Sequence, residues 1–305
     1  MSTSPDSLDT VAIFRERIGA DLVRFRKFLR QVVRNRLAFA GLILIMFFIV
    51  LSLAAPLLVG PYPTQFQRTT PEQPPSDRHL LGTDVQGYDT LTLLLYGGQV
   101  SLLIAFTASA VAMIVGTLIG LVAGYYGRLT DQVLSRATDF FLVIPWLPFA
   151  LILMTIMGPT MATMIIAIAL VSWPTTARVI RSQVITIKQR MFITRSRAIG
   201  AAGSHILRKH VLPNVMPLVW AEAVLTISGA VFTEAFLSFF GLGPKDNPIF
   251  SWGTMVNQSY QDLGLLAGRW WYFGPPGIFI TLVVLGFAML GYGLEEILNP
   301  ALRRR

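Results

Sequence analysis

Uncharged apolar runs that are long enough to cross a lipid bilayer constrain this chain more than any other feature. Residues 37–59 carry no charged side chain over 23 positions. As a helix rising about 1.5 Å per residue, this run would reach roughly 35 Å, enough to span a bilayer with some tilt. Across the chain only 13% of residues are charged, whereas 53% are hydrophobic. The sequence therefore predicts an all-α, polytopic membrane protein and not a soluble domain.

Six apolar runs divide the chain. We expect transmembrane helices near residues 37–59, 100–125, 134–157, 161–180, 215–240 and 276–294. Pro145 and Pro148 should kink the third helix, because proline interrupts helical hydrogen bonding. The segments 60–96 and 241–272 would then lie outside, and residues 97–297 would form a core of five helices after the first span.

Basic residues gather in three places, and this distribution predicts the orientation. Eight basic residues against two acidic ones lie between Arg15 and Arg36, interleaved with apolar residues, so that 1–36 reads as a basic amphipathic segment on an anionic lipid surface. The segment 181–214 contains no acidic residue, and the tail 298–305 ends in three arginines. The positive-inside rule places all three segments in the cytoplasm, with both termini inside and six spans between them. Membrane orientation thus accounts for the net charge of +9, and no nucleic-acid partner is needed.

Small residues and charges within the spans suggest how the helices pack. Gly116, Gly120 and Gly124 recur every four residues and would form a ridge that another helix can approach closely. Arg136 and Asp139 are three residues apart and could pair along one helix face.

The stretch from Thr194 to Asn214 is a charged island between apolar spans. Phe192, Ile199, Ala202 and Ile206 recur at helical spacing and would form one apolar stripe. Glycine interrupts this stretch, and Pro213 should start a new helix, so the expected form is helix, break, helix and then the next span. By periodicity alone, a helix resting on anionic lipid remains an equal alternative.

Two glutamates lie inside the fifth span. Ionisable groups within a membrane are costly, so Glu222 and Glu234 should face the helix bundle or an aqueous cavity. Glu222 could belong to a translocation path that meets a cationic group of the substrate, or it could be hydrogen-bonded to a neighbouring helix. Glu234, near the outer end, is expected to anchor the following turn.

Several signatures of catalysis are missing from the sequence. It contains no GxxxxGK[ST] phosphate loop, so ATP binding is not expected in this chain. It has no cysteine, and His205 and His210 are five residues apart, on different faces of a helix, without a carboxylate beside them. We therefore expect no catalytic residue, metal site or cofactor here.

Part of the charged island resembles a known motif. The spacing of Gly200, His210 and Leu212-Pro213 is similar to the cytoplasmic EAA loop of importer-type ABC permeases, in which a short coupling helix docks into a cleft on the ATPase subunit. Thr-Arg-Ser at 194–196 stands where the family has Glu-Ala-Ala, and His210 stands where isoleucine is common. The resemblance assigns ATPase coupling to Arg197, Ala198, Gly200, Ala201, Ala202, Ser204, His205, Leu207, His210 and Pro213.

The resemblance extends from about Arg34 to Leu302. The blocks look like those of the C-type permease subunit of dipeptide and oligopeptide ABC importers: RNRLAFAGLILI, HLLGTDVQGYDTL, GTLIGLVAGYYGRLTDQVLSRATDFFLVIPWLP, WPTTARVIR, EAFLSFFGLG, SWGTM and GYGLEEILNPALR. Departures from the family pattern occur at Tyr88, Ala288, Tyr292, Glu295 and Asn299.

This resemblance implies the importer-type ABC permease fold in a cell inner or plasma membrane. It also implies a homologous B-type permease subunit, two ABC ATPase subunits that hold ATP and Mg²⁺, and an extracytoplasmic substrate-binding protein. A helix around Ala198 to Leu207 would act as the lever that ATPase closure moves.

Other functions remain open at this point. Permeases of this kind also serve nickel chelates and oligosaccharides. A secondary active transporter would need an ion-coupling group within the spans, for which Glu222 is the best-placed candidate. A purely structural membrane scaffold would need neither a cavity nor a docking loop.

Overall fold

The computed structural model describes residues 26, 29–62, 69–245, 250–264 and 266–298. Within these ranges the regular structure is helical, apart from one isolated antiparallel bridge between Thr83 and Asp89. Five of the described helices are long and apolar enough to cross a membrane, and a bent helix pair is a sixth candidate. The expected all-α membrane protein is therefore confirmed. Most of the basic segment 1–36, and the tail after residue 298, lie outside the described residues.

The first span is α2 (Arg36–Leu53), followed by the single turn α3 (Ala55–Leu58). Asn35 caps α2, because its Oδ1 accepts a hydrogen bond from the Ala38 amide at 3.0 Å. The run 37–59 was predicted as one helix, but the structure breaks it at Ala54. Pro56, in the first turn of α3, has no amide with which to continue the α2 ladder.

The second span, α4 (Thr90–Tyr126), begins earlier than the predicted residue 100. Asp89 caps its start by accepting from the Thr92 amide at 2.8 Å. The first turns of α4 are buried by protein, and the indole Nε1 of Trp252 donates to the Leu94 carbonyl at 2.8 Å. The predicted helix start near residue 100 is therefore wrong, because tertiary burial extends this helix past the membrane-like run.

The predicted third span consists of two helices. They are α5 (Arg128–Val143) and α6 (Trp146–Met157), and they meet at an angle of 87°. Ile144, directly before Pro145, has the extended backbone that a residue preceding proline prefers. The kink expected at Pro145 is confirmed, but α5 begins at Arg128 and not near residue 134. Pro148 lies in the first turn of α6, where proline is tolerated.

The bounds of the remaining spans also differ from the predicted ones. They are α7 (Met161–Lys188), α10 (Leu212–Leu237) and α12 (Trp270–Leu298). α12 contains Pro275 and Pro276 and starts before the predicted residue 276. The short helix α11 (Trp252–Gln261) lies inside the predicted external segment 241–272 and packs on α12.

The glycine ridge of α4 lies against α7. A Cβ placed on Gly116 would lie 2.7 Å from the Trp173 carbonyl oxygen, and one on Gly120 would lie 2.6 Å from the Ala177 carbonyl oxygen. At Gly124 the nearest atom of α7 would be 2.8 Å away. Real side chains do not tolerate such distances, so the two backbones approach closely over three successive turns.

Ion pairs join α5 to α7. Asp139 Oδ1 accepts from Arg178 Nη2 at 2.7 Å. The predicted pairing of Asp139 with Arg136 along one helix is therefore wrong. Asp139 instead pairs with Arg178 of the neighbouring helix α7.

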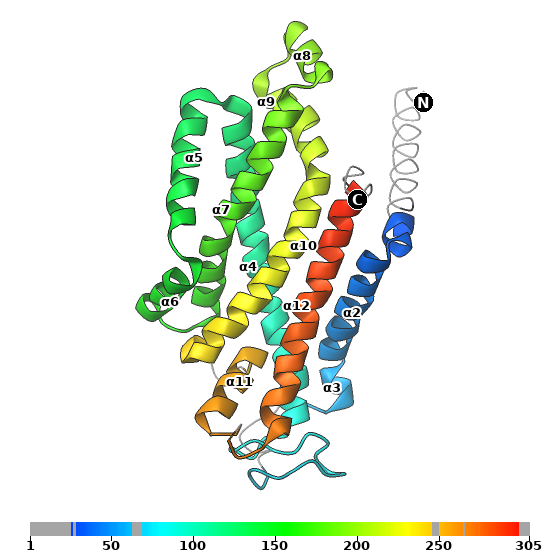
Figure 1. Cartoon of the computed structure of the whole chain (residues 1–305), viewed down its shortest axis with the longest axis vertical. Coiled ribbons are helices and arrows are strands. Elements are labelled where there is room, and N and C mark those ends of the chain that lie inside the picture. Colours follow the sequence, from blue (N-terminus) through cyan, green and yellow to red (C-terminus); the bar gives the residue numbers. More distant parts are fainter. Residues whose placement is uncertain (1–25, 27–28, 63–68, 246–249, 265, 299–305) are drawn as a thin grey trace, which may run out of the picture.

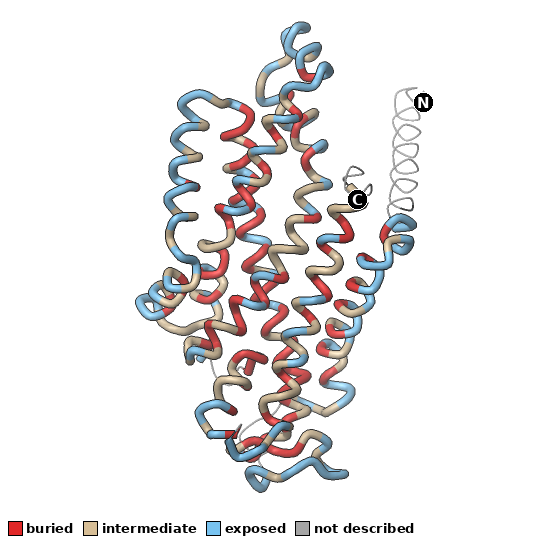
Figure 2. Tube along the Cα trace, in the orientation of Figure 1, coloured by how far each residue is buried: buried red, intermediate tan, exposed pale blue. Residues whose placement is uncertain are grey.

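The core lies where α4, α7, α10 and α12 meet. Buried residues follow the inner faces of these helices, whereas the outward faces of α2 and α5 are largely exposed (Figure 2). Phe48, Trp252 and Phe279 pack edge to face, with centroid separations between 4.9 and 6.3 Å. Exposed apolar residues on the outside, such as Phe47 and Val50, are expected where lipid replaces water.

Candidate functional site

The segment between α7 and α10 projects beyond the end of the bundle. It contains α8 (Met191–Ala198), a turn at Ile199–Ala202, α9 (Gly203–Ile206) and the π-helical turn η2 (Leu207–Val211). We refer to residues 189–211 as the coupling segment. α2 begins and α12 ends at this same end of the bundle (Figure 1).

The coupling segment has the predicted helix, break and helix, but the boundaries differ. Gly200, with φ of +83°, forms the break, which suits glycine because it has no Cβ to clash in this conformation. The helix expected around Ala198 to Leu207 is therefore not continuous: α8 ends at Ala198 and α9 begins at Gly203. The predicted apolar stripe is divided as well, since Ile206 is buried and Ile199 is 86% exposed.

The new α-helix expected at Pro213 is confirmed, since α10 begins at Leu212 with Pro213 in its first turn, but no break separates it from the preceding turn. Helical backbone continues from Gly203 through η2 into α10. A π-turn bonds each amide to the fifth residue before it, and this local widening precedes Pro213, which has no amide to donate in the first turn of α10. Asn214 Nδ2 donates to the His210 carbonyl at 2.7 Å, which satisfies an acceptor at the irregular turn.

The same π-turn changes the histidine geometry. The ring centroids of His205 and His210 lie 6.1 Å apart, although a regular helix would place them on different faces. Ser196 Oγ lies 3.4 Å from His210 Nε2. Among the described residues no group of three or more metal-ligating side chains occurs, so the histidine pair has no third ligand there.

A buried apolar cluster holds the coupling segment against the bundle. Ile193 of α8 and Ile206 of α9 are fully buried. The cluster draws on the ends of α4, α7 and α10 that lie nearest the coupling segment, and it is separate from the main core. We call it the inner cluster, and its buried members are Leu121, Tyr125, Ile180, Val184, Ile187, Ile193, Ile206, Val211 and Val215.

Tyr125 lies at the centre of this attachment. Lys188 Nζ is 5.8 Å from the centroid of its ring, and Arg197 Cζ is 5.6 Å from it. Cations at these distances are attracted to the face of an aromatic ring. Gly203 passes close to the same ring. Sequence reasoning missed Tyr125, because nothing in the motif GLVAGYYG shows which tyrosine turns inward.

Most of the predicted coupling residues face outward. Arg197, Ala198, Gly200 and Ala202 are exposed around the break. Ser204, His205 and Pro213 are also exposed, and the partly buried positions are Ala201, Leu207 and His210. The small residues therefore form an accessible tip, while the larger isoleucines attach it to the bundle.

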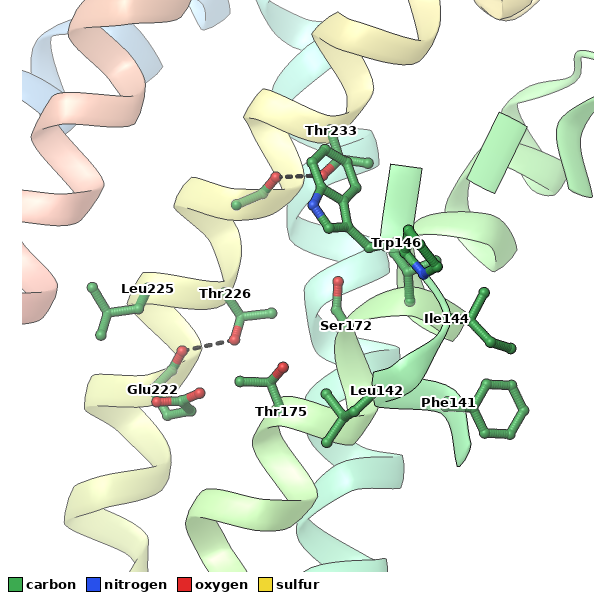
Figure 3. Close-up of a pocket in the computed structure, with 13 residues that line it drawn as sticks. Phe141, Leu142, Ile144, Trp146, Ser172, Thr175, Glu222, Leu225, Thr226 and Thr233 are labelled. Carbon is green, nitrogen blue, oxygen red and sulfur yellow. Dashed lines mark hydrogen bonds between the residues drawn. The ribbon is translucent and has the colours of Figure 1, made fainter. Parts of the chain in front are cut away.

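A second feature is a pocket of about 450 Å³ between α5, α6, α7 and α10. Glu222 of α10 lines it together with hydroxyl side chains and an apolar wall near the α5–α6 bend (Figure 3). The lining residues are Phe141, Leu142, Ile144, Pro145, Trp146, Val171, Ser172, Thr175, Glu222, Leu225, Thr226, Gly229 and Thr233. The sequence indicated Glu222, but the partners from α6 and α7 required the tertiary structure.

Glu234 has a different environment. It is fully buried and accepts hydrogen bonds from Ser101 Oγ at 3.0 Å and Ser238 Oγ at 2.8 Å. Ser101 Oγ in turn accepts from the Trp252 amide at 3.2 Å. Glu234 thus joins α4 to the π-helical turn η3 (Ser238–Leu242) and the start of α11, as expected for an anchor of the following turn.

Comparison with known proteins shows which class of protein this chain belongs to. Residues 116–304 match the family described as the binding-protein-dependent transport system inner membrane component, and residues 24–75 match the N-terminal TM domain of oligopeptide transport permease C. The chain therefore belongs to the family of inner membrane components of binding-protein-dependent transport systems. It is a multi-pass permease component of an ABC transporter and not itself the catalytic subunit.

Individual relatives cover nearly the whole chain. It is 37% identical over 276 residues to the dipeptide transport system permease protein DppC of Bacillus subtilis, covering 90% of this chain and 85% of that protein. It is 38% identical to DppC of Alkalihalophilus pseudofirmus, covering 92% and 90%, respectively. It is 33% identical to the oligopeptide transport system permease protein OppC of Bacillus subtilis, covering 93% and 89%. The predicted resemblance to C-type permeases is thus confirmed.

The fold agrees with this class. A chain of the MetNI methionine ABC transporter in an inward-facing conformation superimposes with a TM-score of 0.54 and 20% sequence identity, covering 68% of this chain and 94% of that one. At this identity the similarity shows the fold alone, and it confirms the expected importer-type permease architecture.

Proposed function

We propose that this chain is the permease subunit of an ATP-driven importer of dipeptides or oligopeptides. The main structural support is the coupling segment. It projects from the bundle, exposes small residues and is attached through buried isoleucines to three spanning helices. The dipeptide and oligopeptide permeases that resemble the chain over about 90% of its length favour peptides over nickel chelates or oligosaccharides.

The assembly we infer contains four kinds of partner. A homologous B-type permease subunit would complete the translocation path, and two ABC ATPase subunits would bind the inner face and hold ATP and Mg²⁺. A substrate-binding protein would deliver cargo to the outer face, and lipid would surround the exposed apolar helices. In this arrangement the coupling segment and both termini are cytoplasmic.

The inner cluster suggests how movement would reach the membrane. Because Ile193 and Ile206 pack with the ends of α4, α7 and α10, displacement of the coupling segment would carry those helix ends with it. The ATPases can shift the equilibrium between inward and outward access only if they bind the two states with different affinity. The exposed tip provides the surface on which such a difference would act.

Site-directed labelling tests this proposal, since the chain has no native cysteine. We expect a thiol in the Ile199→Cys variant to react readily with maleimide in the isolated permease and to be protected in the complex of both permeases and the ATPases, prepared without the binding protein. Ser76→Cys, at an exposed position of the outer loop, is the control and should react equally in both states. ATP-dependent uptake of a labelled dipeptide by the reconstituted transporter is the functional readout. Equal reactivity at residue 199 with and without the ATPases would contradict the docking role.

A further inference from the structure

The pocket that contains Glu222 combines one carboxylate with an apolar wall. No basic side chain lines it among the described residues. The two arginines of the neighbouring α7 are engaged elsewhere, Arg178 with Asp139 and Arg181 with Asp131. In the described part of the chain the Glu222 carboxylate forms no ion pair and accepts no hydrogen bond, and the negative charge of Glu295 also acts on it. A carboxylate at membrane depth is costly unless a cation meets it.

Three of the four hydroxyl groups that line the pocket, all except that of Thr175, already donate their protons. Ser172 Oγ donates to the Ile168 carbonyl, Thr226 Oγ1 to the Glu222 carbonyl and Thr233 Oγ1 to the Gly229 carbonyl, each at 2.8 Å. A hydroxyl that donates to its own helix has only acceptor lone pairs left. These groups and the carboxylate therefore offer acceptors to whatever occupies the pocket.

An acceptor lining fits a donor-rich ligand. An ammonium group has three N–H donors, no acceptor and a positive charge, so it complements this lining in both hydrogen bonding and charge. Leu142 and Trp146 place apolar surface beside these acceptors, suited to the carbon atoms attached to an amine (Figure 3). An anionic group would meet the negative charge of Glu222, and only the Thr175 hydroxyl and the Trp146 indole could donate hydrogen bonds to it.

We propose that this pocket is a transit site for the protonated amine of the imported substrate, with Glu222 as the residue that selects for positive charge. This assignment rests on the proposed import function, because the imported peptide supplies the amine. The source of the amine is either the amino terminus of a peptide or a lysine side chain, which present the same chemistry to the pocket.

Charged thiol reagents test the selectivity without requiring transport. In the purified complex, Thr175→Cys places a thiol in the pocket, and Ser76→Cys is the reference on the exposed outer loop. The probes are trimethylammonioethyl and sulfonatoethyl methanethiosulfonate, which are similar in size and opposite in charge. We expect the ratio of cationic to anionic reaction rates to be about tenfold higher at residue 175 than at residue 76, because a charged cleft concentrates counter-ions. Adding Glu222→Gln should return the ratio to the reference value, and Glu222→Asp should preserve it.

Substrate protection distinguishes the two sources of the amine. Alanyl-norleucine and alanyl-lysine, delivered by the binding protein during turnover, should slow labelling at residue 175. Equal protection assigns the site to the peptide amino terminus, and protection by alanyl-lysine alone assigns it to the side chain.

Three outcomes would overturn the proposal. They are a rate ratio at residue 175 no higher than the reference, a ratio unchanged by Glu222→Gln, and the absence of protection by either peptide while uptake proceeds. If the wild-type transporter moves no peptide but the Glu222-dependent ratio persists, then the peptide import function fails and the cation-selective pocket stands.

Discussion

Arg181 of α7 holds Asp131 of α5 through two parallel hydrogen bonds. Nε lies 2.5 Å from Oδ1, and Nη2 lies 2.8 Å from Oδ2. Their side chains are 34% and 22% exposed, whereas those of the neighbouring pair Arg178 and Asp139 are 60% and 62% exposed. Two ion pairs thus join the same helices, but only one combines bidentate geometry with partial burial.

This contrast gives a prediction about stability. Asp131→Ala should lower the free energy of unfolding by about 1–3 kcal/mol, since it leaves a partly buried guanidinium without its partner. Asp139→Ala is the matched control and should cost at most about 1 kcal/mol, because exposed pairs are screened by solvent. Thermal unfolding of the detergent-purified protein would measure both, and equal losses would contradict the ranking.

A second prediction concerns the contact between α4 and α7. Gly120→Val should destabilise the protein by about 1–3 kcal/mol or more, because the added atoms would overlap the Ala177 carbonyl and force the helices apart. Gly277→Ala in α12 is the control, since a Cβ there meets nothing within 4 Å. The control should leave stability unchanged or raise it by up to about 1 kcal/mol through helix propensity. Thermal unfolding checks the pair, and tolerance of valine at residue 120 would argue against close approach.

A third prediction separates folding from coupling at Gly200. A Cβ at this position meets no atom within 4 Å, so Gly200→Trp should cost only the backbone strain of φ +83°, of order 1 kcal/mol. We expect normal membrane insertion but loss of transport, with ATP hydrolysis no longer linked to substrate, because the bulky group blocks the docking tip.

Gly268 provides the matched control for this experiment. It has φ of +70° and equally open surroundings, but it lies in the segment between α11 and α12. Gly268→Trp should leave the ATPase subunits bound to the permease, as measured by co-purification. Normal uptake by the Gly200→Trp transporter would show that the tip does not dock.

The fourth prediction concerns Tyr125. Tyr125→Phe keeps the ring that Lys188 and Arg197 approach, so the coupling segment should remain attached. Tyr125→Leu removes the ring and should weaken the attachment by about 1–2 kcal/mol, the sum expected for two cation–π contacts at partly exposed sites. Hydrogen exchange of residues 191–202 should then rise in the leucine variant alone. Equal exchange in the two variants would show that the cations contribute nothing.

Much of the architecture could be predicted because a membrane span is a continuous run of apolar residues, which the local composition shows. The lack of charge in 37–59 and the extended residue before Pro145 each reflect chemistry that acts within a few residues. Helix ends were predicted less well. Asp89 is a local cap for α4, but the burial of the first turns of α4 by Trp252, far away in the sequence, has no local signal.

The sequence alone determined that this protein is an all-helical membrane protein with a glycine break at residue 200 and an acidic residue inside its fifth span. Each of these follows from hydropathy, backbone freedom or charge at single positions. Only the tertiary structure decided that Asp139 pairs with Arg178, that Tyr125 receives two cations and that Glu222 faces a pocket built from four helices. The physical reason is that these are contacts between helices, and their geometry depends on how far each helix rotates and slides when its buried face packs.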